Sequence, residues 1–239
     1  MRVFVYICSL ALVITSLAGC GGSDGPREDG ASDQPYNPVT NPADFAAAAG
    51  NPLWPLVPGT RYVYRGGDET IEVTVTGDTK QILGVTNVVV HDVVSVDGKI
   101  IEDTYDWFAQ DSAGNVWYFG ETTKEHEDGQ VVSTEGSWEA GVDGAKPGIV
   151  MHAAQPAIGS PYRQEYYVGE AEDMAEVVSL SESVTVPYGS FEGCLQTREF
   201  TPLEPGVSEY KYYAPGVGLV LEVHVKSGSR MELIEVTTP

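Results

Sequence analysis

Short runs of alternating apolar and polar residues, separated by turn sequences, constrain the fold of this chain more than any other feature. Ile71, Val73 and Val75 alternate with polar residues, as in a β-strand that buries one face. Asp97-Gly98 and Asp128-Gly129 separate later runs, and these residue types tolerate the backbone angles of tight turns. No helical window of convincing length interrupts the pattern. Sequential hairpins of this kind predict an all-β protein built as an antiparallel meander.

The alternation predicts about eleven strands from twelve candidate segments. They are expected at residues 61–64, 70–76, 85–96, 99–109, 115–124, 130–138, 162–168, 175–186, 195–201, 208–214, 219–226 and 230–236. Residues 142–159 hold two Pro and several Gly residues and are expected to form a long loop. Within 219–226, Glu222, His224 and Lys226 share the face opposite to the apolar residues, so one face of the sheet is core and the other is wet or functional. So many antiparallel strands are expected to curve into a half-barrel or barrel with a concave face.

The composition changes near residue 50. Residues 20–50 are rich in Gly, Ser, Asp, Pro, Asn and Ala and hold almost no branched apolar residues, so they cannot bury enough surface to offset the entropy of ordering. We expect a disordered, flexible linker there, with residues 42–49, capped by Asn41, as a candidate short helix. Residues 51–239 are long enough for one hydrophobic core and short for two, so we expect a single β-rich domain.

The first residues have the layout of an export signal. Arg2 precedes an apolar run from Val3 to Ile14, and small residues follow, so residues 1–19 read as a signal peptide. The run is shorter than the roughly 20 residues needed to cross a bilayer. No later window is apolar enough to span a membrane.

The end of this signal, Leu17-Ala18-Gly19-Cys20, resembles the lipobox of bacterial lipoproteins. The resemblance implies that Cys20 becomes the acylated N-terminus and anchors the protein to a membrane of the cell envelope, whereas an ordinary signal peptide is the alternative. Two or three acyl chains hold a protein at a membrane essentially irreversibly. Gly21 follows the cysteine in place of the Asp that favours inner-membrane retention. In a host with two membranes, the resemblance therefore favours the outer membrane.

The net charge of the chain limits the classes of molecule that it can bind. The chain holds 13 Lys and Arg against 35 Asp and Glu residues, for a net charge of −22. This surface repels nucleic acid, since phosphate contacts need the basic residues that are scarce here. Cations, basic peptides and neutral ligands remain open. Beside Cys8 and Cys20 only Cys194 is left, so no internal disulfide is expected, and we expect Cys194 to be a buried structural thiol rather than a reactive one.

Familiar catalytic and metal motifs are absent from the sequence, and no cofactor is predicted. The four histidines are scattered along the chain, with His152 and His224 the best pair for zinc. The acidic stretch from Glu170 to Glu176 and nearby Glu165 offer oxygen ligands for calcium, but solvated acidic turns are commoner in so acidic a chain. We predict no metal site.

The rare basic residues are more informative, because three of them fall in predicted strands next to aromatic residues. In a curved sheet, these residues would line the concave face, with the tyrosines as apolar walls and the cations fixing a polar head group. The candidate ligand-binding residues are Tyr162, Arg163, Tyr166, Arg198, Lys211 and Tyr213. The simpler alternative is ordinary cross-strand ion pairs with Glu165, Glu199 and Glu209.

The C-terminal quarter of the chain, from Ser183 onward, resembles uncharacterised secreted bacterial lipoproteins. The shared features are a P-x-G-x-F turn, here Pro187-Tyr188-Gly189-Ser190-Phe191, and a later hairpin, here Tyr212-Tyr213-Ala214-Pro215-Gly216-Val217-Gly218. No catalytic residues come with that group. The lipid-anchored all-β layout also looks like carrier lipoproteins of the LolA/LolB type, which implies a half-barrel that holds acyl chains.

These observations favour a membrane-anchored lipoprotein that acts as a binder rather than as an enzyme. The expected ligand is a lipid or other apolar or amphiphilic molecule, or a partner in the cell envelope. A hydrolase that uses acidic residues and a purely structural envelope scaffold are the alternatives. A binder predicts an apolar cavity, whereas a hydrolase predicts two or more buried carboxylates that converge in a cleft.

Overall fold

The computed structural model describes residues 36–46 and 50–239, and the strands in this part of the chain form one antiparallel sheet. The strands are β1 (Phe45–Ala46), β2 (Arg61–Gly66), β3 (Glu69–Ile82), β4 (Val85–Val96), β5 (Lys99–Asp111), β6 (Val116–Glu127), β7 (Gln130–Ser133), β8 (Trp138–Glu139), β9 (Lys146–Met151), β10 (Pro161–Arg163), β11 (Glu165–Tyr166), β12 (Met174–Val186), β13 (Gly189–Phe200), β14 (Ser208–Ala214), β15 (Gly218–His224) and β16 (Arg230–Thr237). A short 3-10 helix, η1 (Pro42–Asp44), precedes them. The all-β prediction is confirmed, although the sixteen strands exceed the predicted eleven.

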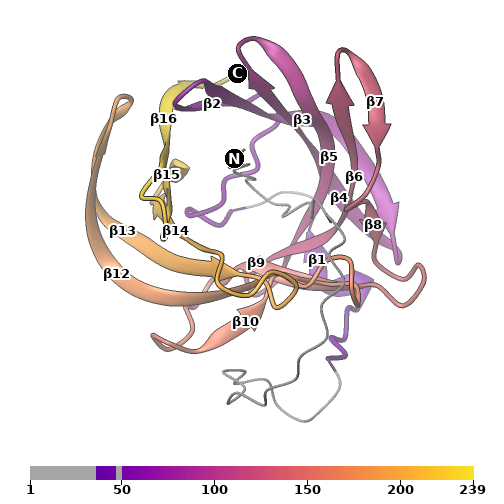
Figure 1. The fold of residues 1–239 in the computed structure, drawn as a ribbon. Coiled ribbons are helices and arrows are strands. Elements are labelled where there is room, and N and C mark those ends of the chain that lie inside the picture. The colour runs from indigo at the N-terminus through magenta and orange to yellow at the C-terminus, as the bar shows by residue number, and fades with distance from the viewer. Residues whose placement is uncertain (1–35, 47–49) are drawn as a thin grey trace, which may run out of the picture.

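The sheet curls almost into a ring (Figure 1). Consecutive strands pair from β2 to β6 and from β12 to β16, and β16 returns to pair with β2, with Leu233 opposite Tyr64. On the other side of the ring, β10 pairs with β12 while β11 pairs with β9. Only Gln164 separates β10 from β11. One short segment therefore joins the two edges of the sheet and closes the barrel.

This junction depends on a strand that the sequence pattern did not predict. The expected loop at 142–159 contains β9, so the loop prediction is wrong for residues 146–151. A Cβ atom on Gly148 would lie 2.3 Å from the carbonyl carbon of Gln164 and 2.6 Å from the amide nitrogen of Glu165. A side chain at this position would push β9 away from β11. The Pro and Gly residues that suggested a loop instead permit a close approach of two strands.

Apolar residues on the outer face of the sheet are covered by a second layer. The long β12–β13 hairpin packs against β15 and β16, and the amide of Tyr188 near its tip donates to the carbonyl of Leu233 at 3.1 Å. Val184 and Cys194 of this hairpin are buried, as is Leu221 of β15. The side chain of Leu221 therefore packs outward, under the hairpin. The polar face of β15, with Glu222 opposite Lys211 of β14, points into the barrel.

The described residues before position 51 also contact the barrel. β1 pairs with β5, and the ring of Phe45 meets the ring of Phe119 edge to face at 5.5 Å. The hydroxyl of Tyr36 donates to the carbonyl of Pro147 at 2.9 Å. Asn41 caps η1 at Pro42–Asp44, within the expected helix at 42–49, but the next two residues form β1 instead, and residues 47–49 lie outside the described residues. Packing thus begins before the expected domain boundary at residue 51.

Other predictions concern parts of the chain that this structure does not describe. The signal peptide at 1–19 and the lipidation site Cys20 lie outside the described residues. Within the described ranges, no helix is long and apolar enough to cross a membrane.

Candidate functional site

Buried carboxyl groups are the main chemical feature of the barrel interior. Their burial is costly unless they are protonated, hydrogen-bonded or paired with a cation. Among the described residues, the buried acids are Glu69, Asp92, Glu102, Asp106, Glu121, Glu165, Glu209 and Glu222. In the same part of the chain, Lys211 is the one buried basic residue. The interior of this barrel is therefore strongly acidic.

Lys211 stands at the centre of one group of these acids. Its Nζ atom lies 3.0 Å from Oε2 of Glu199 and 3.6 Å from Oε2 of Glu222. Glu199 also accepts hydrogen bonds from the hydroxyls of Tyr213 at 2.8 Å and Thr197 at 2.9 Å. Burial, together with the nearby carboxyl of Glu209, holds the pKa of Glu222 well above its ordinary value. One ammonium group is thus shared among several carboxyls.

A second group of acids lies on β4 and β5. The hydroxyl of Tyr118 donates to Oδ1 of Asp106 at 2.7 Å, and burial raises the pKa of Asp106 to about 7. Burial raises the pKa of Glu102 to about 8, against the opposing effect of a hydrogen bond from Thr104. Burial and the neighbouring Asp106 and Glu102 carboxyls hold the pKa of Asp92 well above its ordinary value. At neutral pH, some of these carboxyl groups are therefore protonated.

An apolar cavity of about 70 Å³ lies beside these acids, at one end of the barrel. Its walls are Leu53, Trp54, Pro55, Leu56, Tyr62, Tyr64, Val73, Val75, Val90, Phe108, Tyr213, Val217, Gly218 and Leu219, and its polar side chains are Asp92 and Asp106. The Oδ1 atom of Asp92 has no hydrogen-bond partner within the described residues. The cavity thus joins apolar walls to one unsatisfied carboxyl oxygen.

Residues 51–56 close this end of the barrel. Asn51 fixes the segment: its side-chain amide donates to the carbonyl of Gly114 at 3.0 Å, and its backbone amide donates to the side chain of Gln110 at 2.9 Å. The Trp54 ring lies 5.5 Å from the ring of Phe108 and 5.9 Å from the ring of Tyr213. We call residues 51–56 the plug. The plug makes one wall of the cavity, so its position sets the cavity volume.

The six predicted ligand-binding residues divide between two faces of the sheet. Strand register places Lys211, Tyr213 and Tyr162 inside the barrel, where Tyr213 lines the apolar cavity. Arg198 pairs instead with Glu176 across β12 and β13 at 2.9 Å. The six residues therefore do not form one cluster.

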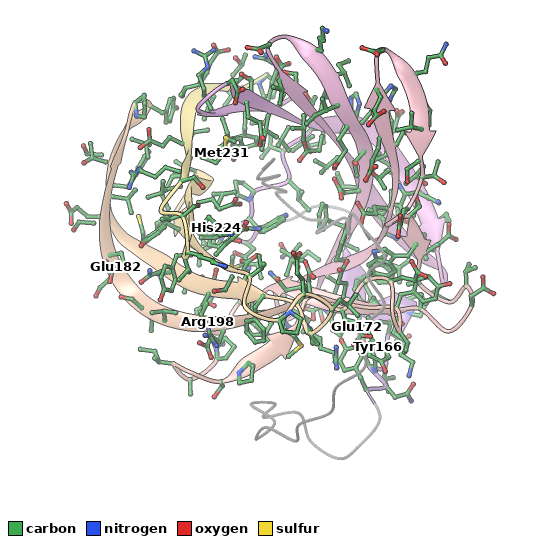
Figure 2. The ribbon with its side chains drawn as sticks, in the orientation of Figure 1. Tyr166, Glu172, Glu182, Arg198, His224 and Met231 are labelled. Carbon is green, nitrogen blue, oxygen red and sulfur yellow. The ribbon has the colours of Figure 1, made fainter. Side chains whose placement is uncertain are left out.

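Arg163 and Tyr166 belong to a separate contact at the closing segment. The Arg163 guanidinium lies 4.5 Å from the ring centre of Tyr166 and 3.8 Å from the carboxylate of Glu172. Tyr166 and Glu172 lie together in Figure 2, and Arg198 lies apart from them. These contacts match the alternative of ordinary ion pairs, although Arg163 and Arg198 use other carboxylates than those expected.

Four of the candidate metal ligands make contacts of other kinds. His152 packs edge to face on Tyr162, and the backbone amide of Ser227 donates to Nδ1 of His224 at 3.1 Å. Glu172 and Glu176 pair with arginines, as described above. In the described part of the chain, no group of three or more His, Cys, Asp or Glu residues has the geometry to hold a metal ion. Cys194 is buried, and burial raises the pKa of its thiol, which makes the thiolate less available.

Sequence reasoning missed Asp92, Glu102 and Asp106. All three lie on strands whose apolar and polar residues alternate as they do in the other strands. Another acid on β5, Asp103, faces outward, so the presence of an acid does not by itself indicate burial. Their one sequence signal is an acid at a position that shares a face with apolar residues, as Asp92 does with Val90 and Val94.

Comparison with known proteins leaves the family open. No family model matches this chain, and no curated protein matches it. A provisionally described exported protein with a YmcC-like fold from Bacteroides fragilis aligns at 15% identity over 82% of this chain and 100% of its own, with a TM-score of 0.44. A provisionally described lipoprotein from Parabacteroides distasonis aligns at 13% identity over 80% of this chain and 100% of its own, with a TM-score of 0.42. Similarity at these TM-scores carries no argument about function, and the likeness to LolA/LolB-type carriers stays a prediction.

Proposed function

We propose that this chain is an exported, lipid-anchored protein whose barrel binds an apolar or amphiphilic molecule at the plugged end. The observation that supports this proposal is the apolar cavity of about 70 Å³ beside Trp54. Apolar cavities in proteins stay dry and take up apolar groups. The volume accommodates only a small group, so a longer ligand needs the plug to move outward.

The cavity also suggests the chemistry of the ligand's polar end. Oδ1 of Asp92 is buried and has no partner within the described residues. A buried carboxyl oxygen without a partner costs free energy that a hydroxyl or ammonium group on the ligand would recover. We therefore favour a ligand with a hydrogen-bond donor next to its apolar part.

Membrane attachment through Cys20 places the barrel next to amphiphilic molecules. The proposal rests on Leu17-Ala18-Gly19-Cys20 and, for the outer membrane, on Gly21. Cells that express the Cys20→Ser variant should incorporate no labelled palmitate into the protein, whereas the parent chain should be labelled. Labelling of the variant would contradict lipidation at this residue.

Ligand binding is tested with a neutral apolar dye, N-phenyl-1-naphthylamine. The mature chain with Cys20→Ser, which stays unlipidated, should enhance the fluorescence of the dye with one-to-one saturation. Val73→Phe fills the cavity and should abolish the enhancement. Val93→Phe is the matched control, because Val93 lies on the next strand and faces outward. A parent chain that binds no dye, or a Val73→Phe variant that binds like the parent, would overturn the proposal in favour of a structural scaffold.

A hydrolase is the second candidate, because Asp92 and Asp106 both line the same cavity. Two carboxyls in one cleft are the usual arrangement for glycoside hydrolysis. The small cavity leaves little room for a sugar and its leaving group, which favours the binder. Hydrolysis of any member of a panel of aryl glycosides by the parent chain, lost in Asp106→Asn, would favour the enzyme.

A further inference from the structure

The end of the barrel opposite the plug contains a much larger cavity, of about 1430 Å³. Its rim is formed by the β2–β3, β4–β5 and β6–β7 turns and by the start of β16. The lining residues are Gly66, Gly67, Asp68, Glu69, Val96, Asp97, Lys99, Ile100, Ile101, His126, Glu127, Asp128, Gly129, Ser229, Arg230 and Met231. This cavity shares no lining residue with the apolar cavity at the plugged end.

Acidic groups dominate the polar lining of this cavity. Five of the lining residues are Asp or Glu, and two are Lys or Arg. Arg230 is already paired, because its guanidinium lies 2.8 Å from the carboxylate of Glu232. A cavity lined mainly by one sign of charge concentrates ions of the opposite sign. The open end of the barrel should therefore attract cations.

Glu69 is the buried acid in the lining of this cavity. Its side chain lines the cavity and is only 7% exposed, and its Oε1 atom has no hydrogen-bond partner within the described residues. Burial and the carboxyls of Asp68 and Glu209 raise the pKa of Glu69 to about 7. A buried carboxylate without a partner is unfavourable, and a bound cation would supply the missing donor.

The other walls indicate an organic cation rather than a bare metal ion. Val96, Ile101 and Met231 line the cavity beside Glu69, and Met231 lies on the inner side of β16 (Figure 2). Methylene groups pack on such walls, whereas a metal ion gains nothing from them. Nor does the described part of the chain offer a set of three metal ligands. A chain of methylenes between ammonium groups matches both the acids and the apolar walls.

We propose that the open end of the barrel binds a linear aliphatic polyamine, with one ammonium group on Glu69 and its methylenes on Val96, Ile101 and Met231. Further along the interior, Glu102 is buried on β5 opposite Val94 of β4, and it is the partner for the next ammonium group. The chain itself contains a pairing of this kind, because the ammonium group of Lys211 lies between the carboxyl groups of Glu199 and Glu222.

The test is a calorimetric titration of spermidine into the mature chain carrying Cys20→Ser, at low ionic strength. We expect saturable binding of one spermidine per chain. Glu69→Gln removes a charge-assisted hydrogen bond and should weaken binding by about tenfold to a hundredfold. Glu69→Gln should not unfold the protein, because it removes a costly buried charge, and a thermal melt of the variant verifies this.

The matched control is Glu72→Gln on the same strand. Glu72 faces outward and pairs with Arg61 at 2.8 Å, so this variant loses the same charge outside the cavity. Equal weakening by the two variants would show nonspecific attraction to an acidic protein and would overturn the proposal. So would the absence of saturable binding, or displacement of spermidine by an equal concentration of Mg²⁺. Val73→Phe, which blocks the apolar cavity, should leave spermidine binding unchanged.

Discussion

The two ends of the barrel use the same strands for opposite chemistry. On β3, the inner face carries Val75 and Val73 at the plugged end and Glu69 at the open end. The plugged end is closed by Trp54 against aromatic rings, whereas the open end keeps a large acidic cavity. A barrel with this many strands is too wide to be filled by side chains alone. The difference teaches that one end is filled by the protein itself and the other is left for a solute.

The acids between the two ends give the largest expected effect. Lys211→Met removes the ammonium group shared by Glu199 and Glu222 and leaves buried carboxylates unpaired. Loss of one partner from a buried ion pair costs about 3–5 kcal/mol, so urea unfolding at alkaline pH should show a loss of that size. Lys226→Met, at an exposed position, is the control and should change little. A stable Lys211→Met variant would show that Lys211 does not neutralise the interior.

Acidification should stabilise the fold, because the carboxyl groups of the interior titrate near neutral pH. The apolar plug has no such groups, so this test separates the two regions. The folded chain raises the pKa of Glu102 to about 8 and of Asp106 to about 7, so it binds more protons than the unfolded chain between about pH 4 and pH 8. The contribution of these carboxyl groups to the free energy of unfolding is therefore fully present at the acidic side of this window. It is lost as pH rises through 7 to 8. We expect Glu102 alone to contribute a gain of about 2–4 kcal/mol from pH 8 to pH 5, with a further gain from Asp106.

Thermal melts across this range measure the effect. Glu102→Gln removes one of the titrating groups and should reduce the gain. A melting temperature that falls steadily on acidification from pH 8 would show that these carboxyls are ionised in the folded protein.

Removal of the plug's aromatic side chain tests the other end. Trp54→Ala deletes the contacts with Phe108 and Tyr213 and should cost about 2 kcal/mol, less than a fully buried Trp because Trp54 is partly exposed. The enlarged cavity should bind the apolar dye more tightly. Val57→Ala, just beyond the plug and exposed, serves as the control. Weaker dye binding by Trp54→Ala would mean that Trp54 is part of the binding surface rather than its cover.

The smallest effect is expected at Cys194, which lies in the outer layer away from both ends. Cys194→Ala should cost about 1 kcal/mol through lost packing and should change neither dye nor spermidine binding. The native thiol should react slowly with iodoacetamide, because it is buried and its pKa is raised. Rapid alkylation of the folded protein would identify Cys194 as a reactive group.

The sequence predicted individual strands well where alternation and turns agree. The expected strands at 85–96 and 208–214 coincide with β4 and β14. Alternation also separated Glu222 from the apolar residues of β15, but it does not say which face lies inside a ring. That choice depends on the β12–β13 hairpin, which covers the side chain of Leu221 from outside.

The candidate sites were harder to predict for the same reason. Arg163 and Arg198 were grouped with Lys211 by their aromatic neighbours, yet the ring places the two arginines in ion pairs and Lys211 inside. Asp92 and Asp106 meet only because β4 and β5 pair in one register. Contacts between strands, rather than local sequence, create both cavities.

The most direct test of the two-ended barrel is a titration of the dye into protein already saturated with spermidine. We predict that both ligands bind at once, that Val73→Phe abolishes only dye binding, and that Glu69→Gln weakens only spermidine binding. Mutual displacement of the two ligands, or loss of both through either variant, would contradict the account, because it would show one continuous site in place of two.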